Sequence, residues 1–235
     1  MAFAVFDIET RIDKSLLNRA FYPNEVIDDE EAYRRFREES RSDFAPISIH
    51  VPISIAVGDL DENYILRSVE SLALADYSEE NLVREFWARV DRFKGCLVTF
   101  NGRHFDLPVL ELAALRYEIA APNYFVEPGS VRYRYSDRHL DLYEFISNYG
   151  AVRLRGGLDL LLKMIGMPGK GAIDGARIQE LYEAGRMDEI HRYCRFDVIQ
   201  TCFLLLRVEL MRGRLGPTAY EAAREAAARF MNELA

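Results

Sequence analysis

The sequence predicts one α/β domain: a mixed β-sheet, made of a three-strand meander plus further strands, flanked by helices. The chain opens with an apolar run typical of a strand, residues 2–9. Two more strand-like runs, 47–59 and 63–69, meet at the turn-forming sequence Gly-Asp-Leu-Asp-Glu-Asn and predict a hairpin. Helical and strand-like segments alternate after it, which favours a mixed sheet covered by helices.

The composition is that of a folded protein. The 235 residues are 49% hydrophobic and 29% charged, which allows one sizeable core and argues against a disordered chain. No apolar run approaches the roughly 20 residues of a membrane helix. The N-terminus lacks the pattern of a secretory signal, and the three cysteines form no Cys-x-x-Cys pair. We therefore expect a cytoplasmic protein with reduced thiols and no membrane contact.

The formal net charge of −8 argues against a broad surface for binding polyanions. Eight acidic and four basic residues lie at positions 25–43, inside a segment between the first strand and the hairpin. We interpret this segment, at about 11–45, as a charged insertion that forms a solvated helix or a mobile flap. Two roles stay open for it: a surface excursion without chemistry, and a docking arm for a repair or replication protein.

The remaining elements follow from local patterns. A helix over 78–93 begins at Ser78, and its apolar residues recur at helical spacing. The later elements are a strand at 96–100, a helix at 107–120, a strand turning into a helix at 139–150, a helix at 158–167, a Gly-rich turn at 169–178, two short helical stretches at 178–185 and 187–213, and a terminal helix over the last 20 residues.

Two carboxylates stand in the apolar opening run, Asp7 and Glu9. Side chains alternate across a strand, so both point to one face while Phe6 and Ile8 point to the other. Two like charges on one face of a central strand repel each other unless a cation lies between them. Two interpretations stay open: the strand ends at Glu9 with both residues solvated at its edge, or the pair binds a metal.

Other polar residues lie at the ends of predicted elements. Asp106 and Asn101 lie at a strand-to-helix junction, where Asp is often a helix N-cap and Asn a turn residue. Tyr193 and Asp197 are four residues apart on one helix face, where a plain Tyr–Asp contact is the alternative. As a set, four carboxylates without a Cys pair or several His residues suit Mg²⁺ or Mn²⁺ better than zinc.

In order, these groups resemble the Exo I, Exo II and Exo III motifs of the DEDD exonuclease superfamily: Asp-x-Glu at 7–9, Asn-x-x-x-Phe-Asp at 101–106 and Tyr-x-x-x-Asp at 193–197. The tyrosine is typical of the DEDDy branch. The chain is most similar to stand-alone predicted 3′–5′ exonucleases related to the proofreading domain of family B DNA polymerases, which His-Leu-Asp-Leu-Tyr-Glu-Phe at 139–145 also resembles. The resemblance implies a ribonuclease H-like fold, with residues 1–235 forming a single exonuclease domain.

The resemblance also implies the chemistry. The enzyme would hydrolyse phosphodiester bonds at the 3′ end of single-stranded nucleic acid, with DNA favoured, and release nucleoside 5′-monophosphates. Two divalent ions, Mg²⁺ or Mn²⁺, would be held by the four carboxylates, with Asp7 shared, Glu9 and Asp197 on the first ion and Asp106 on the second. Tyr193 would orient the attacking water through its hydroxyl, because a phenol of ordinary pKa is a poor base at neutral pH.

Substrate contacts are expected near these groups. Asn101 and Phe105 belong to the second motif and are expected to shape the approach of the terminal nucleotide, with a core position as the alternative for Phe105. Thr10 directly follows Glu9, and the resemblance implies a contact from its backbone or hydroxyl to the terminal sugar. Residues 132–155 hold five Arg against three acidic residues, with tyrosines interleaved at the start. Arg for phosphates and Tyr for stacking is the composition of a single-strand track, so we assign Arg132 and Arg134 to guiding the strand.

Three alternatives to a DNA exonuclease stay open. They are a catalytically silent nucleic-acid-binding module of a repair complex, an oligoribonuclease-like RNA exonuclease, and a structural partner that docks through the acidic segment. The sister DEDDh branch carries a histidine five residues before the last aspartate, a position that holds Arg192 here. We therefore interpret His191 as a surface residue of its helix.

Overall fold

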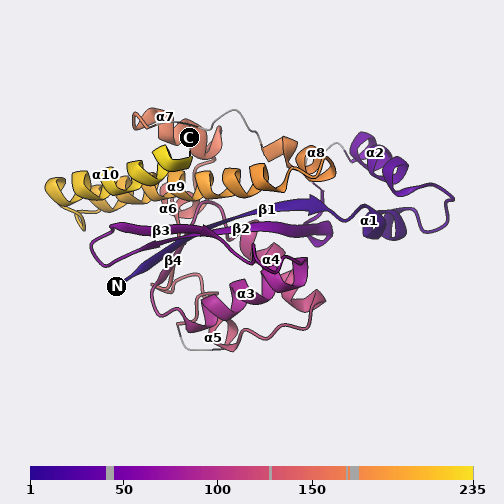
Figure 1. The fold of residues 1–235 in the computed structure, drawn as a ribbon, viewed down its shortest axis with the longest axis horizontal. Coiled ribbons are helices and arrows are strands. Elements are labelled where there is room, and N and C mark those ends of the chain that lie inside the picture. The colour runs from indigo at the N-terminus through magenta and orange to yellow at the C-terminus, as the bar shows by residue number, and fades with distance from the viewer. Residues whose placement is uncertain (41–44, 127–128, 168, 170–174, 235) are drawn as a thin grey trace.

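The first strand lies in the middle of the sheet. The computed structural model describes residues 1–40, 45–126, 129–167, 169 and 175–234. Within them, a five-stranded sheet has the order β3-β2-β1-β4-β5 (Figure 1). β1 pairs antiparallel with β2 and β2 with β3, whereas β1, β4 and β5 run parallel. The strands are β1 (Phe3–Ile12), β2 (His50–Leu60), β3 (Leu66–Ser71), β4 (Cys96–Thr99) and β5 (His139–Asp141). The predicted mixed sheet with a three-strand meander is confirmed.

Helices cover both faces of this sheet (Figure 1). One face packs on α3 (Glu79–Arg92), α4 (Asp106–Arg116) and α5 (Pro122–Phe125). The other packs on α7 (Gly157–Met164), α9 (Met187–Met211) and α10 (Pro217–Leu234). The shorter elements are α1 (Lys14–Phe21), α2 (Asp29–Glu39), α6 (Leu142–Ile146), α8 (Ile178–Glu183) and the 3₁₀ turns Ile47–Ile49 and Gly175–Arg177. Among the described residues, no helix combines the length and apolar character needed to cross a bilayer.

Strand β1 is buried on both faces because its apolar residues alternate between two cores. Phe3 and Val5 belong to the core under α9, whereas Phe6 and Ile8 belong to the core over α3 and α4. The strand continues to Ile12 between two neighbours. The interpretation of a strand that ends at Glu9 with solvated edge residues is therefore wrong, and Asp7 and Glu9 lie on the α9 face.

The helical stretch predicted at 187–213 is found as α9, a single helix of 25 residues from Met187 to Met211. It lies between the sheet and α10, so apolar residues surround it on several sides instead of forming one stripe. The same packing overturns the prediction that His191 is a surface residue. Its side chain is buried, and its Nδ1 lies 2.8 Å from the Ser54 hydroxyl of β2.

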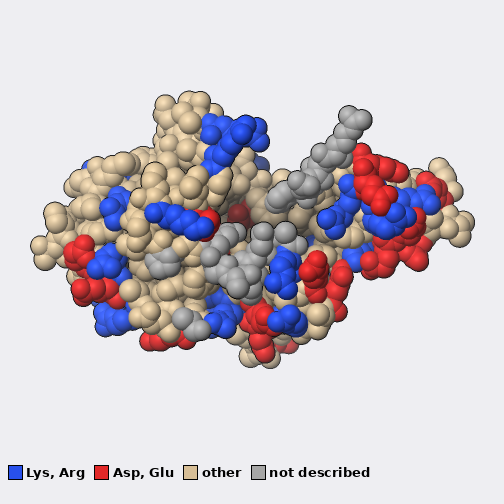
Figure 2. Space-filling view, turned by 90° about the horizontal axis from the view of Figure 1, so that it is seen from above, with Lys and Arg blue, Asp and Glu red and all other residues tan. Residues whose placement is uncertain are grey.

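The charged segment after β1 folds into the helix pair α1–α2, which extends beyond the C-terminal end of β1 (Figure 1). Of the two predicted forms, the structure has the solvated helix over Asp29–Glu39, while residues 41–44 of the predicted segment lie outside the described residues. Acidic and basic side chains are mixed over this end of the molecule (Figure 2). Most of the Gly-rich turn predicted at 169–178 also lies outside the described residues.

Candidate active site

Asp7 and Glu9 meet the side of α9 that faces β1. The Cys194 thiol donates to the Asp7 backbone oxygen at 3.3 Å and lies 3.8 Å from Asp7 Oδ2. One potential ligand atom from each of Asp7, Glu9 and Cys194 lies within 4.8 Å of the other two. Burial raises the pKa of the Cys194 thiol well above its ordinary value, and the negative charges of Asp7 and Glu9 raise it further. The thiol therefore stays protonated, and the carboxylates are the available anionic donors.

Tyr193 and Asp197 follow one helical turn apart on α9 and are both buried. Burial raises the pKa of Tyr193, and the negative charges of Asp197, Glu9 and Asp7 raise it further, together with a hydrogen bond to Asp197. The phenol is thus surrounded by three carboxylates from two distant parts of the chain. It stays protonated at neutral pH, so it acts as a hydrogen-bond donor.

A β-bulge in the pairing of β1 with β2 lies close to Tyr193. The β1–β2 register shifts between Glu9 and Thr10, where Thr10 faces Pro52. Proline has no N–H to give to the ladder, which makes this a natural place for an irregularity. The residue passed over by the shift, Ile53, packs in the same apolar cluster as Tyr193. The bulge therefore helps to fix the tyrosine ring beside Glu9.

Asp106 is the first residue of α4, and Phe105 occupies the N-cap position. The N-cap interpretation of Asp106 is therefore wrong. Burial raises the pKa of Asp106 to about 7, with the charges of Asp141 and Asp197 adding to it and backbone hydrogen bonds, one from Ile8, opposing it. The hydrogen bond from Ile8 shows that the second motif contacts the first. The effect of the Asp197 charge on Asp106 shows that the third motif is also close.

A cavity of about 790 Å³ opens beside Asp7 and Asp106. Its wall includes two of the predicted substrate-binding residues, Asn101 and Phe105. Asn101 has φ 66°, a left-handed conformation that Asn tolerates better than most residues. Asn101 therefore starts a turn that ends at Asp106, and the side chains of Asn101 and Phe105 line the cavity.

Thr10 takes part in a contact inside the protein. Its hydroxyl lies 2.8 Å from His50 Nδ1, and the His50 ring packs edge-on against Phe105 with 5.1 Å between ring centroids. This chain of contacts links β1, β2 and the turn before α4. Thr10 thus supports a wall of the cavity through His50.

The two arginines predicted to guide the strand lie in a different region of the surface. Arg132 pairs with Glu111 at 3.0 Å, and Arg134 pairs with Glu144 at 3.0 Å. Arg134 lines a second cavity of about 620 Å³, and the tyrosines interleaved with the two arginines are exposed. The structure therefore does not bring these arginines to the cavity beside Asp7.

The donor set fits divalent cations. All four carboxylates contribute hard oxygen atoms, which suit Mg²⁺ or Mn²⁺. The raised pKa values of Asp106 and Tyr193 report negative charge gathered in a poorly hydrated place. Bound cations would relieve this repulsion. The residues that would hold them are Asp7, Glu9, Asp106 and Asp197.

Sequence reasoning missed two residues at this site. Asp141 accepts backbone hydrogen bonds from Asn101 at 3.0 Å and from Arg103 at 2.9 Å, so it fixes the turn before α4. Cys194 contacts Asp7, as described above. Asp141 stands in the 139–145 motif and Cys194 follows Tyr193, so both lie in stretches that the resemblance singled out, although neither contact is local in sequence.

Comparisons with known proteins agree with this picture. Residues 42–235 match the family described as "Predicted 3'-5' exonuclease related to the exonuclease domain of PolB". The match includes Asp106, Tyr193 and Asp197, whereas Asp7 and Glu9 precede it. No curated protein matches the sequence.

Solved structures resemble the fold. The family B DNA polymerase from the archaeon Pyrobaculum calidifontis matches with a TM-score of 0.57 and 17% identity, over 89% of this chain and 24% of the polymerase. A product-bound exonuclease I gives a TM-score of 0.43 at 13% identity, over 90% of this chain and 48% of that one. E. coli exonuclease I with a 5cy-dT13 oligonucleotide gives 0.40 at 14%, over 80% and 42%.

The chain spans about a quarter of the polymerase that it resembles. The shared architecture is the ribonuclease H-like fold, a mixed five-stranded sheet flanked by helices, as expected from the sequence. The family match covers well over half of the chain. The chain therefore belongs to the family of predicted 3′–5′ exonucleases related to the exonuclease domain of PolB, a family of nucleases.

Proposed function

We propose that this protein is a metal-dependent exonuclease that removes nucleotides from the 3′ end of single-stranded nucleic acid, with DNA favoured, and releases nucleoside 5′-monophosphates. The observation that carries the proposal is the convergence of charge on Tyr193. Burial raises its pKa, and the negative charges of Asp197, Glu9 and Asp7, which come from distant parts of the sequence, raise it further. Asp106 belongs to the same electrostatic group through Asp197.

Each side chain has a distinct part in this reaction. Asp7, Glu9, Asp106 and Asp197 would hold two divalent cations, which when bound would neutralise the phosphate and activate a water molecule. Tyr193 keeps its proton and orients the attacking water by its hydroxyl, because burial and the neighbouring carboxylates disfavour the phenolate. Glu9, Asp106, Tyr193 and Asp197 are buried, which strengthens the electrostatic interactions among them.

Substrate binding is assigned to two regions. Asn101 and Phe105 line the cavity beside the carboxylates, where the terminal nucleotide has to lie for its phosphate to reach them. We also assign Arg132 and Arg134 to the more distant part of the strand, where phosphates would replace Glu111 and Glu144 as their partners. Thr10 acts indirectly in this proposal, by holding His50 against Phe105.

The first test is digestion of a 5′-labelled single-stranded DNA oligonucleotide with Mg²⁺, Mn²⁺ or EDTA. We expect a ladder of shortened products with either metal and none with EDTA. Asp7→Asn keeps the shape of the side chain and removes its charge, so the rate should fall by at least about a hundredfold, the effect of losing one group that stabilises the transition state. Asp76→Asn, in the exposed segment before α3, is the matched control and should leave the rate unchanged.

Two outcomes would contradict the proposal. Equal digestion by wild type and Asp7→Asn would mean that the reaction takes place elsewhere. No digestion of DNA, and none of labelled RNA, by correctly folded wild-type protein would favour the silent binding module. Digestion of short RNA alone would move the assignment to the oligoribonuclease-like alternative.

A further inference from the structure

One wall of the cavity beside the carboxylates comes from outside the three sequence motifs. Phe36 and Ser40 line it together with Asp7 and Asp106. Phe36 belongs to α2 and Ser40 is its C-cap, so both come from the charged segment inserted between β1 and β2. The Phe36 ring is partly exposed, and Phe105 also lines the cavity. The cavity is thus lined by both aromatic rings and carboxylates.

The α1–α2 pair has its own small core. Leu17, Tyr22 and Ala32 are buried there together with Ile12 and Ile49 at the ends of neighbouring elements. Phe36 packs against this cluster, and its ring lies 4.8 Å from that of Phe21. Phe36 is therefore attached to a packed unit that is continuous with β1.

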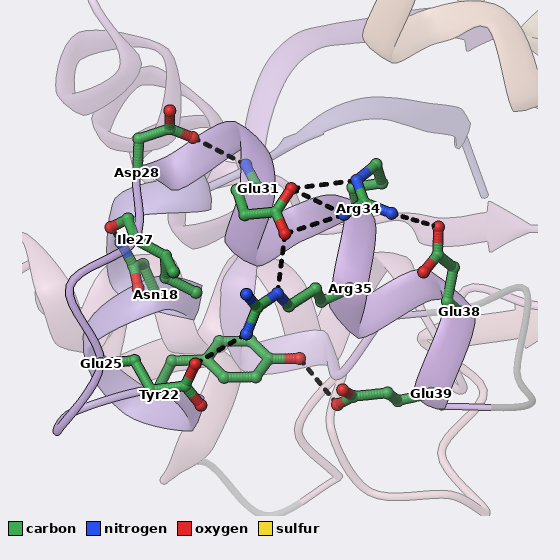
Figure 3. Close-up of polar contacts among 10 residues, drawn as sticks. All are labelled: Asn18, Tyr22, Glu25, Ile27, Asp28, Glu31, Arg34, Arg35, Glu38 and Glu39. Atoms are coloured by element: carbon green, nitrogen blue, oxygen red, sulfur yellow. Dashed lines mark hydrogen bonds and ion pairs between the residues drawn. The ribbon is translucent and has the colours of Figure 1, made fainter.

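Ion pairs add to this packing. Arg35 contacts both Glu25 and Glu31 at 2.7 Å, and the Tyr22 hydroxyl donates to Glu39 at 2.9 Å (Figure 3). The unit is tied to α8 as well, since the backbone N–H of Ile12 donates to the Gln179 side chain at 2.7 Å. Much of the charge of the segment is used inside the pair, so the wall that carries Phe36 is formed before substrate arrives.

The chemistry of this cavity selects its occupant. Aromatic lining favours a flat ring, and the carboxylates in the same lining favour an attached group that approaches through cations. An unpaired nucleobase joined to its phosphodiester has both properties. A base still paired in a duplex would bring a second strand into the space between α2 and the turn before α4.

We propose that Phe36 stacks on the unpaired 3′-terminal base, and that the α1–α2 pair thereby selects single-stranded ends. The inserted segment is then a specificity element of the active site. This inference rests on the proposed function, since it assigns the cavity to the terminal nucleotide of the strand that is cleaved.

The first experiment measures stacking without cleavage. An oligonucleotide carrying 2-aminopurine as its 3′-terminal base is titrated with protein in EDTA. Wild type should quench the fluorescence on binding, because the base stacks on a ring, and Phe36→Leu should bind the oligonucleotide with little quenching. Phe125→Leu is the matched control: its exposed ring on α5 does not line the cavity, so the quenching should be kept.

The second experiment compares cleavage of two oligonucleotides that differ only in the last base, which is present in one and absent in the other. Wild type should lose about tenfold in kcat/KM on the abasic end, the order expected for one base–aromatic stack. On the normal end, the kcat/KM of Phe36→Leu should be about tenfold below that of wild type. On the abasic end, it should be little lower than that. The two losses are then not additive, as for two groups in direct contact.

The outcomes separate the two proposals. Equal losses by Phe36→Leu on both substrates, or no loss on either, would overturn the role of Phe36 while the exonuclease assignment stands. Quenching that depends on Phe36 without any metal-dependent cleavage would support the base site and overturn the proposed function. Absence of quenching with wild type would overturn the base site whatever the cleavage result.

Discussion

The Tyr193 hydroxyl lies among negative charges, and burial with those charges raises its pKa. We predict that Tyr193→Phe lowers kcat by about tenfold to a hundredfold and leaves KM nearly unchanged. The loss stays near or below the lower end of general acid–base effects, roughly 10²–10⁴-fold, because the phenol orients the water without taking its proton. Steady-state kinetics with labelled DNA would measure both constants.

The pH profile distinguishes the two possible roles of this tyrosine. A phenol that stays protonated adds no rise or fall to the plot of rate against pH between pH 6 and 9. The plots for wild type and Tyr193→Phe should therefore have the same shape. A rise in rate with pH that is present in wild type and absent in Tyr193→Phe would show that the phenolate is the base. Tyr64→Phe is the control, since Tyr64 is also buried and donates to a carboxylate, Glu209, at 2.6 Å.

Sequence patterns predict some residues of this site better than others. The helical spacing of Tyr193 and Asp197 is local, so it could be read from the sequence alone. The environment of Cys194 and His191 could not, because it depends on β1 and β2 packing against α9. Histidine is intermediate between mostly buried and mostly exposed residue types, so its type alone does not predict burial, and the packing of α9 between the sheet and α10 makes this one buried.

Two loops at the ends of β4 and β5 are joined through Asp141. Its carboxylate accepts hydrogen bonds from the backbone N–H groups of Asn101 and Arg103 and, at the start of α6, from those of Tyr143 and Glu144. We predict that Asp141→Ala lowers the free energy of unfolding by about 2–4 kcal/mol, because it removes a helix cap and leaves buried donors unpaired. Urea unfolding monitored by circular dichroism would measure the loss.

The effect should be specific to this junction. Asp91→Ala is the matched control, since Asp91 also accepts a backbone hydrogen bond, from Asn123 at 2.9 Å, but serves a single helix start. It should lose only about 1 kcal/mol. Equal losses by the two variants would argue against a special role for Asp141. Asp141→Asn should recover part of the stability, because the amide oxygen still accepts.

Whole elements follow the sequence closely where one pattern dominates. The helix predicted over 78–93 is found at Glu79–Arg92, with Ser78 accepting the hydrogen bond of its first turn. The helical stretch predicted at 187–213 is also found, as α9 (Met187–Met211), although α9 is apolar on several faces, which weakens its helical period. The position of α2 beside the cavity depends on contacts between distant segments. Composition alone therefore predicted the charged insertion, but not that α2 forms part of the cavity wall.

At the scale of the molecule, the order of strands assembles the site. β1 is central and α9 crosses its face, so residues from the start and the end of the chain meet without a long connecting arm. The turn after β4 enters from the parallel side of the sheet. Site residues therefore lie beside both main cores, and global unfolding would disperse the carboxylates completely. Stability of the whole fold and competence of the site are linked for this reason.

His139 offers a test of that global stability through pH. Its side chain is buried on β5, with Nε2 2.9 Å from the Thr99 hydroxyl, and burial lowers its pKa well below the ordinary 6.5, helped by the positive charge of Arg103. Below about pH 6.5, the His139 side chain binds a proton in the unfolded chain but not in the folded protein. The stability that the neutral ring supports is therefore complete above pH 6.5 and is lost as the pH falls below it.

We predict that, below pH 6.5, the free energy of unfolding of wild type falls more steeply than that of His139→Gln, by up to about 1.4 kcal/mol per pH unit. The comparison is needed because Asp106 acts in the opposite direction: its raised pKa means that protonation below about pH 7 favours the folded state. This contribution is common to both proteins and cancels in the difference. Urea unfolding at pH 7.5, 6.5, 5.5 and 5.0 measures it, and parallel curves would mean that His139 is protonated in the fold.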